Sequence, residues 1–213
     1  MCGFQGTLPL IVCRIDYDLL LFLPVLVASC FLAWATVRRT PEYTQGSKIN
    51  VIAVFLMAVL AYALYLIFGL SVNLLKWVLL TDIFLYAGIS DYKIRRVPDW
   101  VSITVTLLGF IAVSGGKLLW NAVAGAAAFG FFFLAAVISK NKIGGADVKF
   151  IAACMFVCGI STGTAGLILG LLLSVIGTVI RNKKTKSKDN SLPMIPYLSV
   201  GFLTAYMIGG IKL

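Results

Sequence analysis

The chain of 213 residues is 61% hydrophobic and only 12% charged, whereas a soluble domain carries about 25% charged residues. This apolar excess cannot be buried in one soluble core, so composition excludes a large soluble domain and indicates a bilayer-embedded protein. The formal net charge is +10, there is no histidine, and the five cysteines form no CxxC pair. We therefore expect no metal site, no cofactor and no histidine-based catalytic triad.

Apolar segments follow one another along the whole chain. The first residues, MCGFQGTLPLIVCRIDYDLL, lack the basic start and cleavage site of a signal peptide, so we expect no cleaved leader. The segments that then predict spans cover residues 17–37, 51–70, 72–90, 100–114, 118–139, 147–160, 163–180 and 194–211. Small residues in AVAGAAAFG and GLILG predict close helix contacts. The expected fold is an all-α polytopic membrane protein with about eight transmembrane helices.

The positions of lysine and arginine predict the orientation. With the N-terminus outside, 14 of the 18 basic residues fall in inner loops, and only Arg14, Lys76, Lys117 and Lys212 do not. This predicts a multi-pass plasma (inner) membrane protein with its N-terminus outside. We attribute the net charge to topology, expect the run RNKKTKSKDN to lie near anionic headgroups, and predict no nucleic-acid partner.

Two aspartates stand at ends of predicted spans, on the same cytoplasmic side. Asp91 ends the third span in ISDYKIRRVPDW, and Asp147 opens the sixth in KNKIGGADVKF. If helix packing brings them together, they can share one proton, because like charges a few ångströms apart do not both ionise. One carboxylate then acts as general base on a water while the other donates to a carbonyl, which is aspartyl-protease chemistry.

The residues around the two aspartates suit such a site. Gly144 and Gly145 allow close backbone approach and unusual dihedral angles at the mouth of a helix. Pro98 and Asp99 predict a helix start, with Asp99 as the N-cap of the fourth span.

Plainer interpretations stay open at this point. Asp147 can simply cap the sixth span, and Asp91 can simply pair with Lys93 or Arg95. Cys154 and Cys158, four residues apart on a predicted helix, fit small buried residues better than a functional pair.

Other classes of function remain as alternatives. A proton-coupled transporter would use Asp82, which lies inside the third span, and a non-catalytic assembly subunit would need no site at all. Asp82 precedes Asp91 by nine residues, which is half a turn out of phase, so the two face opposite sides of their helix. A hydrogen bond to a neighbouring helix or to Lys76 would account for Asp82 without transport.

Two separated motifs resemble one protein family. GGADVKF resembles the GxGD-x-K motif of the type IV prepilin peptidase family, and DYKIRRVPD resembles its first motif, an aspartate followed seven residues later by Pro-Asp or Pro-Asn. IPYLSVGFLTAY, residues 195–206, looks like the proline-led segment that opens the last span of that family. The resemblance covers roughly residues 71–213.

The resemblance implies a six-span membrane aspartyl endopeptidase. Such enzymes remove the leader of prepilins, or of archaeal flagellin-like precursors, at the cytoplasmic face. Residues 71–213 would form the peptidase core, and residues 1–70 would add two leading spans joined by a short cytoplasmic loop. The expected partners are prepilin-like precursors and the lipid bilayer.

The resemblance also implies roles for particular residues. Asp91 and Asp147 would be the catalytic pair. The supporting residues would be Gly144, Gly145, Ala146, Lys149, Pro98 and Asp99. Ala146 replaces the second glycine of the motif and is expected to narrow the backbone conformations of the loop. Long family members carry a cytoplasmic domain with paired CxxC motifs that is linked to N-methylation. The loop at residues 38–50 is short and has no cysteine, so we do not expect methyltransferase activity.

Overall fold

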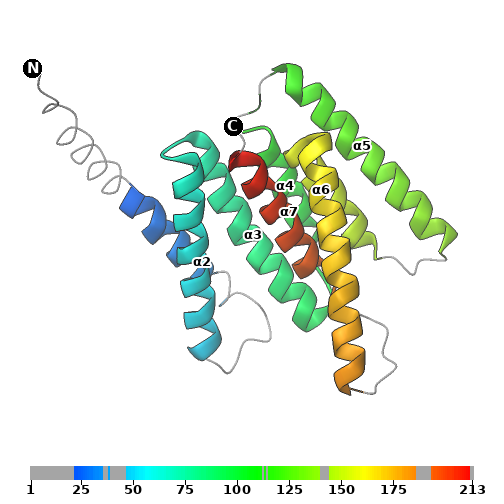
Figure 1. Ribbon diagram of the computed structural model, residues 1–213, viewed down its shortest axis with the longest axis horizontal. Helices are drawn as coiled ribbons and strands as arrows, with labels where there is room; N and C mark the ends of the chain where they lie inside the picture. The colour runs from blue at the N-terminus through cyan, green and yellow to red at the C-terminus, as the bar shows by residue number, and fades with distance from the viewer. Residues whose placement is uncertain are drawn as a thin grey trace, which may run out of the picture.

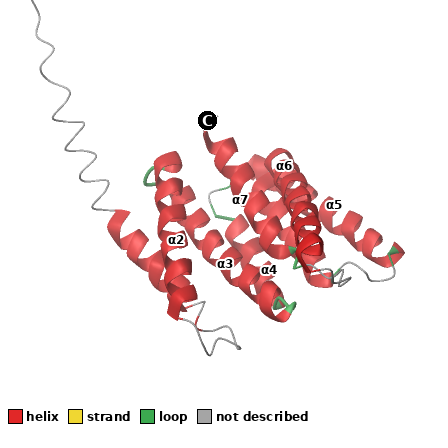
Figure 2. Cartoon of the chain, turned by 60° about the horizontal axis from the view of Figure 1, so that its bottom comes forward, coloured by secondary structure: helices red, strands yellow, loops and turns green. Residues whose placement is uncertain are grey.

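A computed structural model describes residues 22–35, 38, 47–111, 113, 115–139, 144–185 and 193–211. These residues are helical apart from short turns, and no strand occurs among them (Figures 1 and 2). The all-α prediction is therefore confirmed for this part of the chain. Several predicted features lie outside the described residues: the N-terminal residues 1–21, most of the 38–50 loop, Lys140 and Lys142, and residues 186–190 of the basic run.

Each predicted span corresponds to helical structure. An apolar helix covers Phe22–Ala35. It is followed by α2 (Ser47–Phe68), α3 (Val72–Ile94), α4 (Asp99–Gly109), α5 (Gly115–Ile138), α6 (Gly145–Thr185) and α7 (Ile195–Ile211). The sixth and seventh predicted spans both fall within α6. Local interactions define several helix ends. The Ser71 hydroxyl accepts from the Leu74 N–H at the start of α3, and Gly69, with φ of 59°, follows the last residue of α2 in a non-helical conformation.

The number of membrane crossings is not confirmed. Among the described residues, three helices are both long and apolar enough to cross a bilayer: Val72–Ile94, Gly115–Ile138 and Gly145–Arg181. The apolar stretches of the other helices, taken over their described side chains, span 10–17 residues, although α2 as a whole has 22. Length and composition thus support a membrane protein but not the expected count of about eight.

Gly159 divides α6 into two helices. Its φ of 76° and ψ of 177° are not helical, so the helix that begins at Gly145 stops there and a second one continues to Thr185. A Cβ atom at this position would lie 2.7 Å from the Asn121 Oδ1 on α5. Both the backbone conformation and the neighbouring side chain therefore require glycine.

Replacement of Gly159 by alanine is expected to lower the free energy of unfolding by about 1–3 kcal/mol, because alanine is strained at this φ. Gly130→Ala on α5 is the matched control, since its Cβ would meet nothing within 4 Å. It should raise stability by about 0.5–1 kcal/mol. Thermal unfolding of both variants in the same detergent measures the difference. A Gly159→Ala protein as stable as the wild type would contradict the break in α6 at this residue.

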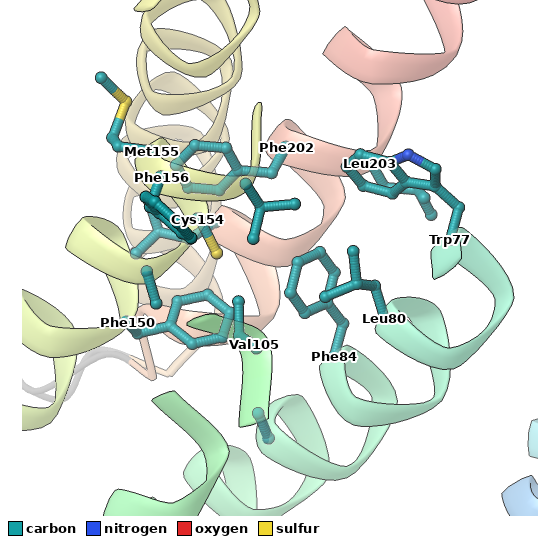
Figure 3. Packing of buried hydrophobic residues seen from close by; sticks show 14 of the residues in the cluster. Trp77, Leu80, Phe84, Val105, Phe150, Cys154, Met155, Phe156, Phe202 and Leu203 are labelled. Atoms are coloured by element: carbon teal, nitrogen blue, oxygen red, sulfur yellow. The ribbon is translucent and has the colours of Figure 1, made fainter. Parts of the chain in front are cut away.

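The buried core joins α3, α4, α6 and α7 (Figure 3). Phe84 of α3 and Phe150 of α6 meet edge to face with ring centroids 5.4 Å apart. Trp77 of α3 stacks on Tyr206 of α7 at 3.6 Å. The two aromatic pairs lie at different heights along α3, so they fix its middle beside the start of α6 and its N-terminal part beside the end of α7.

Three of the glycines singled out in the sequence lie at close helix crossings, whereas Gly130 in the same stretch as Gly125 meets nothing within 4 Å. A Cβ at Gly166 or Gly170 of α6 would lie 2.8 Å from the Cα atom of Phe202 or Leu198 on α7, respectively. A Cβ at Gly125 of α5 would lie 3.0 Å from the Cβ of Phe156 on α6. These glycines let backbones approach where any side chain would hold them apart, the usual arrangement for helices packed in a membrane. Figure 1 shows α7 lying between α3 and α6 as a result.

Candidate functional site

Asp91 lies in the last turn of α3 and is buried, with 9% of its surface exposed. The helix ends at Arg95, which adopts the left-handed conformation with φ of 55° and donates its N–H to the Asp91 carbonyl at 3.0 Å. The Ser90 hydroxyl donates to the Arg96 carbonyl at 2.7 Å and ties down the chain after the helix. The end of α3 is thus held by local bonds, and the Asp91 side chain faces the interior.

The start of α7 positions the Asp91 carboxylate. The Ile195 N–H donates to Asp91 Oδ2 at 3.0 Å, and the Met194 N–H also bonds the carboxylate. Both donors are free because they stand at the beginning of a helix, where the first N–H groups have no partner within the helix. Arg95 attracts Asp91 electrostatically, whereas the hydrogen bonds to the carboxylate come from backbone donors of α7.

Asp147 lies in the first turn of α6 and is half-buried. Its carboxylate accepts the Gly144 N–H, and its own N–H donates to the Gly144 carbonyl at 3.1 Å. The bond from the Gly144 N–H to the Asp147 carboxylate is one half of a capping box, so Asp147 does cap its helix, as the plainer interpretation expected. The Asp147 carboxylate also interacts electrostatically with that of Asp91. The structure thus brings together the two aspartates where α3, α6 and α7 meet.

In the motif, the lack of a side chain at glycine matters for the room it leaves to neighbouring atoms, and not for unusual dihedral angles. Among the described glycines, only Gly69 and Gly159 have positive φ, so the expectation of unusual angles at Gly144 and Gly145 is wrong. A Cβ at Gly144 would lie 3.0 Å from Asp147 Oδ2, whereas one at Gly145 would meet nothing within 4 Å. Ala146 is already helical, so a Cβ is compatible with its backbone and the expected narrowing has no consequence here.

If the two aspartates catalyse peptide cleavage, Gly144→Ala is expected to lower its rate at least about tenfold, because the new methyl group displaces the Asp147 carboxylate from its position. Gly145→Ala is the matched control and should keep activity within about twofold, since it adds its methyl group in open space. Initial cleavage rates in the same lipid, with both proteins equally folded by thermal unfolding, decide this. Equal rates for the two variants would contradict the role given to Gly144.

Pro98, Asp99 and Lys149 agree with the sequence expectation except for the residue that caps α4. The helix start at residues 98–99 is confirmed, yet Pro98, not Asp99, is the N-cap of α4, with φ of −61° and ψ of 143°. Asp99 is the first helical residue, and its Oδ1 accepts from Lys149 Nζ at 2.8 Å. The Asp99 carboxylate thus pairs with a lysine of α6, and no side-chain hydrogen bond caps α4. Both side chains are exposed, so the ion pair contributes at most about 1 kcal/mol.

Asp82 is separate from this site. It is 4% exposed, and neither carboxylate oxygen has a hydrogen-bond partner among the described residues. The expected bond to Lys76 is absent, because Lys76 Nζ donates instead to the Ile111 carbonyl at 3.2 Å. Cys154 is buried and Cys158 partly buried, and both are free thiols.

Sequence reasoning missed the backbone donors of Met194 and Ile195. Prolines stand on either side of this pair, at positions 193 and 196, and mark the start of a helix. The first N–H groups of a helix have no partner within it, so this helix start was the signal for possible donors. In the described ranges, no group of three or more His, Cys, Asp or Glu residues is placed to hold a metal ion. The chemistry that this geometry offers is that of two carboxylates and the backbone around them.

Comparison with known proteins supports this picture. Residues 78–181, which include both aspartates, match the sequence profile of the Type IV leader peptidase family. A prepilin leader peptidase/N-methyltransferase of Bacillus subtilis (strain 168) is 28% identical over 150 residues, which are 67% of this chain and 59% of that protein. The chain thus matches less than two thirds of that relative's length. No solved structure matches significantly. With its apolar helices, the chain is an integral membrane protein, and the two matches confirm its resemblance to the Type IV leader peptidase family.

Proposed function

We propose that this protein is a membrane aspartyl endopeptidase that removes the leader peptide of type IV prepilin-like, or archaeal flagellin-like, precursors. The observation that carries the proposal is the meeting of Asp91 and Asp147, from two different helices, close enough for their charges to interact. The match of residues 78–181 to the Type IV leader peptidase family supports the same activity.

The proposed reaction is general acid–base hydrolysis by the dyad. One carboxylate takes a proton from a water molecule, whose oxygen attacks the carbon of the scissile peptide bond. The other, protonated carboxyl group donates its proton to the carbonyl oxygen. The tetrahedral intermediate then breaks its carbon–nitrogen bond, and the amine leaves with a proton from the dyad. The N–H groups of Met194 and Ile195 hold Asp91, and the Gly144 N–H holds Asp147, in place for this exchange.

The proposed location is the plasma (inner) membrane, with the N-terminus outside and the dyad on the cytoplasmic side. This orientation rests on the asymmetry of lysine and arginine along the sequence. Lys93, Arg95 and Arg96 follow Asp91 directly, and Lys149 follows Asp147 by two residues. The end of the molecule that carries the dyad is therefore the basic end.

The proposed peptidase core is residues 71–213, with residues 1–70 as an addition to it. The dyad and all of the backbone groups that hold it fall within that core. We do not extend the proposal to methyl transfer, although the Bacillus subtilis relative is named for both activities, because the present sequence has no CxxC pair.

Co-expression with candidate prepilin-like precursors tests the proposal. Cleavage should appear as a mobility shift, with a new N-terminus defined by mass spectrometry, and it should be absent with an Asp147→Asn protein. A second assay with purified protein in lipid vesicles excludes a host peptidase. Failure to process any precursor in either assay would refute the function.

A further inference from the structure

A groove of about 650 Å³ lies between α4 and α5. Both helices pack against α6, but within the described residues they do not pack against each other, so α6 forms the floor of the groove. Neither Asp91 nor Asp147 lines it. The groove is therefore a separate feature, and what it binds does not depend on the proposed cleavage.

One end of the groove carries a pair of opposite charges that remain open to a ligand. Lys149 Nζ and Asp99 Oδ1 lie 2.8 Å apart, with 48% and 69% of their side chains exposed. Their bond uses one of the three hydrogens of the ammonium group and one of the two carboxylate oxygens. Among the described residues neither group has a further partner, so each can still form a second bond. A ligand that places a negative and a positive group side by side can bind both without separating the pair.

Away from this end, the wall that α4 contributes becomes apolar in a definite order. Ser102 lies three residues after Asp99, about 4.5 Å further along the helix axis. Ile103 and Leu107 follow and are 59% and 61% exposed. The Thr106 hydroxyl, at the same depth, donates to the Ser102 carbonyl at 2.8 Å and needs no partner from a ligand. Charges, a hydroxyl group and then hydrocarbon follow one another as the head group, ester bonds and acyl chain do in a phospholipid.

The geometry points to this groove as a binding site for phosphatidylethanolamine, with an acyl chain between α4 and α5 and the head group on the Asp99–Lys149 pair. The lipid phosphate accepts from the Lys149 ammonium, and the lipid ammonium donates to the Asp99 carboxylate, so four charges alternate in sign. Phosphatidylcholine has no N–H group to donate to Asp99. Phosphatidylglycerol would bring its negative phosphate beside Asp99 without a cation for that carboxylate.

Photolabelling of the full chain in detergent micelles tests the site, with a phosphatidylethanolamine that carries a diazirine on its acyl chain. Adducts should map by mass spectrometry to the turns of α4 and α5 that line the groove. At equal concentrations, unlabelled phosphatidylethanolamine should lower the yield of adduct at least about fivefold more than phosphatidylcholine or phosphatidylglycerol, the upper range for one exposed ionic contact. Equal competition by the three lipids, or adducts spread around the whole surface of α5, would overturn the inference.

Filling the groove should exclude the lipid. Ala126→Trp puts an indole ring into the space of the acyl chain and should lower the yield of adduct at least about fivefold. Ala127→Trp is the matched control, because Ala127 is the next residue of α5, is also exposed and does not line the groove. Its yield should stay within about twofold of the wild type. Proteins are compared at equal folded concentration, with Ala126→Leu in place of Ala126→Trp if the latter does not fold. Equal yields at the two positions would show that the lipid binds elsewhere.

Changing the charged pair should change which lipid is chosen. Asp99→Asn removes the partner of the lipid ammonium, so the order of competition should now favour phosphatidylglycerol. Lys149→Gln should weaken all three lipids about fivefold, whereas Lys117→Gln, at an exposed lysine outside the groove, should have no effect. An unchanged order in Asp99→Asn would refute the head-group assignment. Displacement of the label by a prepilin-like precursor, or crosslinks between two copies from a benzophenone at Ala126, would assign the groove to a peptide or a dimer and overturn the lipid site.

Discussion

Replacement of either Asp91 or Asp147 by asparagine is expected to lower the rate of precursor cleavage at least about a thousandfold while the protein remains folded. Asparagine keeps the size of the side chain and can still accept the N–H bonds of Ile195 or Gly144 through its oxygen. It cannot exchange a proton, and general acid–base catalysis by a positioned group contributes about 10²–10⁴-fold each. Initial rates with purified protein in lipid, at equal concentrations of folded protein, measure the loss.

Asp82→Asn is the matched control, since it removes another buried carboxylate from the same helix as Asp91. Asp82 shares no bond with the dyad, so this variant should retain most of the activity. Near-normal cleavage by a well-folded Asp91→Asn or Asp147→Asn protein would refute the dyad. Loss of activity in Asp82→Asn alone would instead favour the transport alternative.

Gly201→Ala is expected to lower the free energy of unfolding by about 2–4 kcal/mol and to abolish most cleavage in the protein that still folds. A Cβ at Gly201 would lie 2.5 Å from the Gly166 carbonyl oxygen and equally close to the backbone of Gly170. Backbone atoms in the middle of a helix do not move aside as a flexible side chain would, so α7 must shift away from α6. That shift carries Ile195 away from Asp91, which depends on its N–H.

Gly209→Ala provides the comparison on the same helix. Its Cβ would meet Thr162 at 3.7 Å, an ordinary contact, so the gain in helix propensity should leave it as stable as the wild type or slightly more so. Thermal unfolding and cleavage rates are compared for the two variants in one lipid mixture. A Gly201→Ala protein as stable and active as Gly209→Ala would show that the α6–α7 crossing is not as close as described.

Much of the architecture was accessible from the sequence because the controlling physics is local. Apolar runs of sufficient length must form helices in a bilayer, where every backbone polar group needs an internal partner. Charged residues are costly in the hydrocarbon, which favours helix ends for Asp91 and Asp147, although Asp82 lies inside α3. The spacing of small residues in GLILG and AVAGAAAFG indicated where helices approach, and Gly166, Gly170 and Gly125 do lie at close contacts.

The hydrogen bonds and ion pairs of the site depend on which helices pack against each other, and no local sequence pattern specifies that packing. The N–H groups that hold Asp91 come from the start of α7, far along the chain. Asp99 was expected to cap its own helix, but the packing of α4 against α6 presents Lys149 to it instead. Lys76 likewise bonds a carbonyl after α4 and leaves Asp82 without a partner among the described residues.

By itself, the sequence therefore determined where the apolar helices lie, which of their ends carry lysine and arginine, and which two carboxylates are available for chemistry. Each of these follows from hydropathy, charge or residue size along the chain. Only the tertiary structure decided that the charges of these carboxylates interact and which N–H groups hold them. These features arise from contacts between segments distant in the chain, whose geometry is set by how glycines and aromatic rings fit between helices.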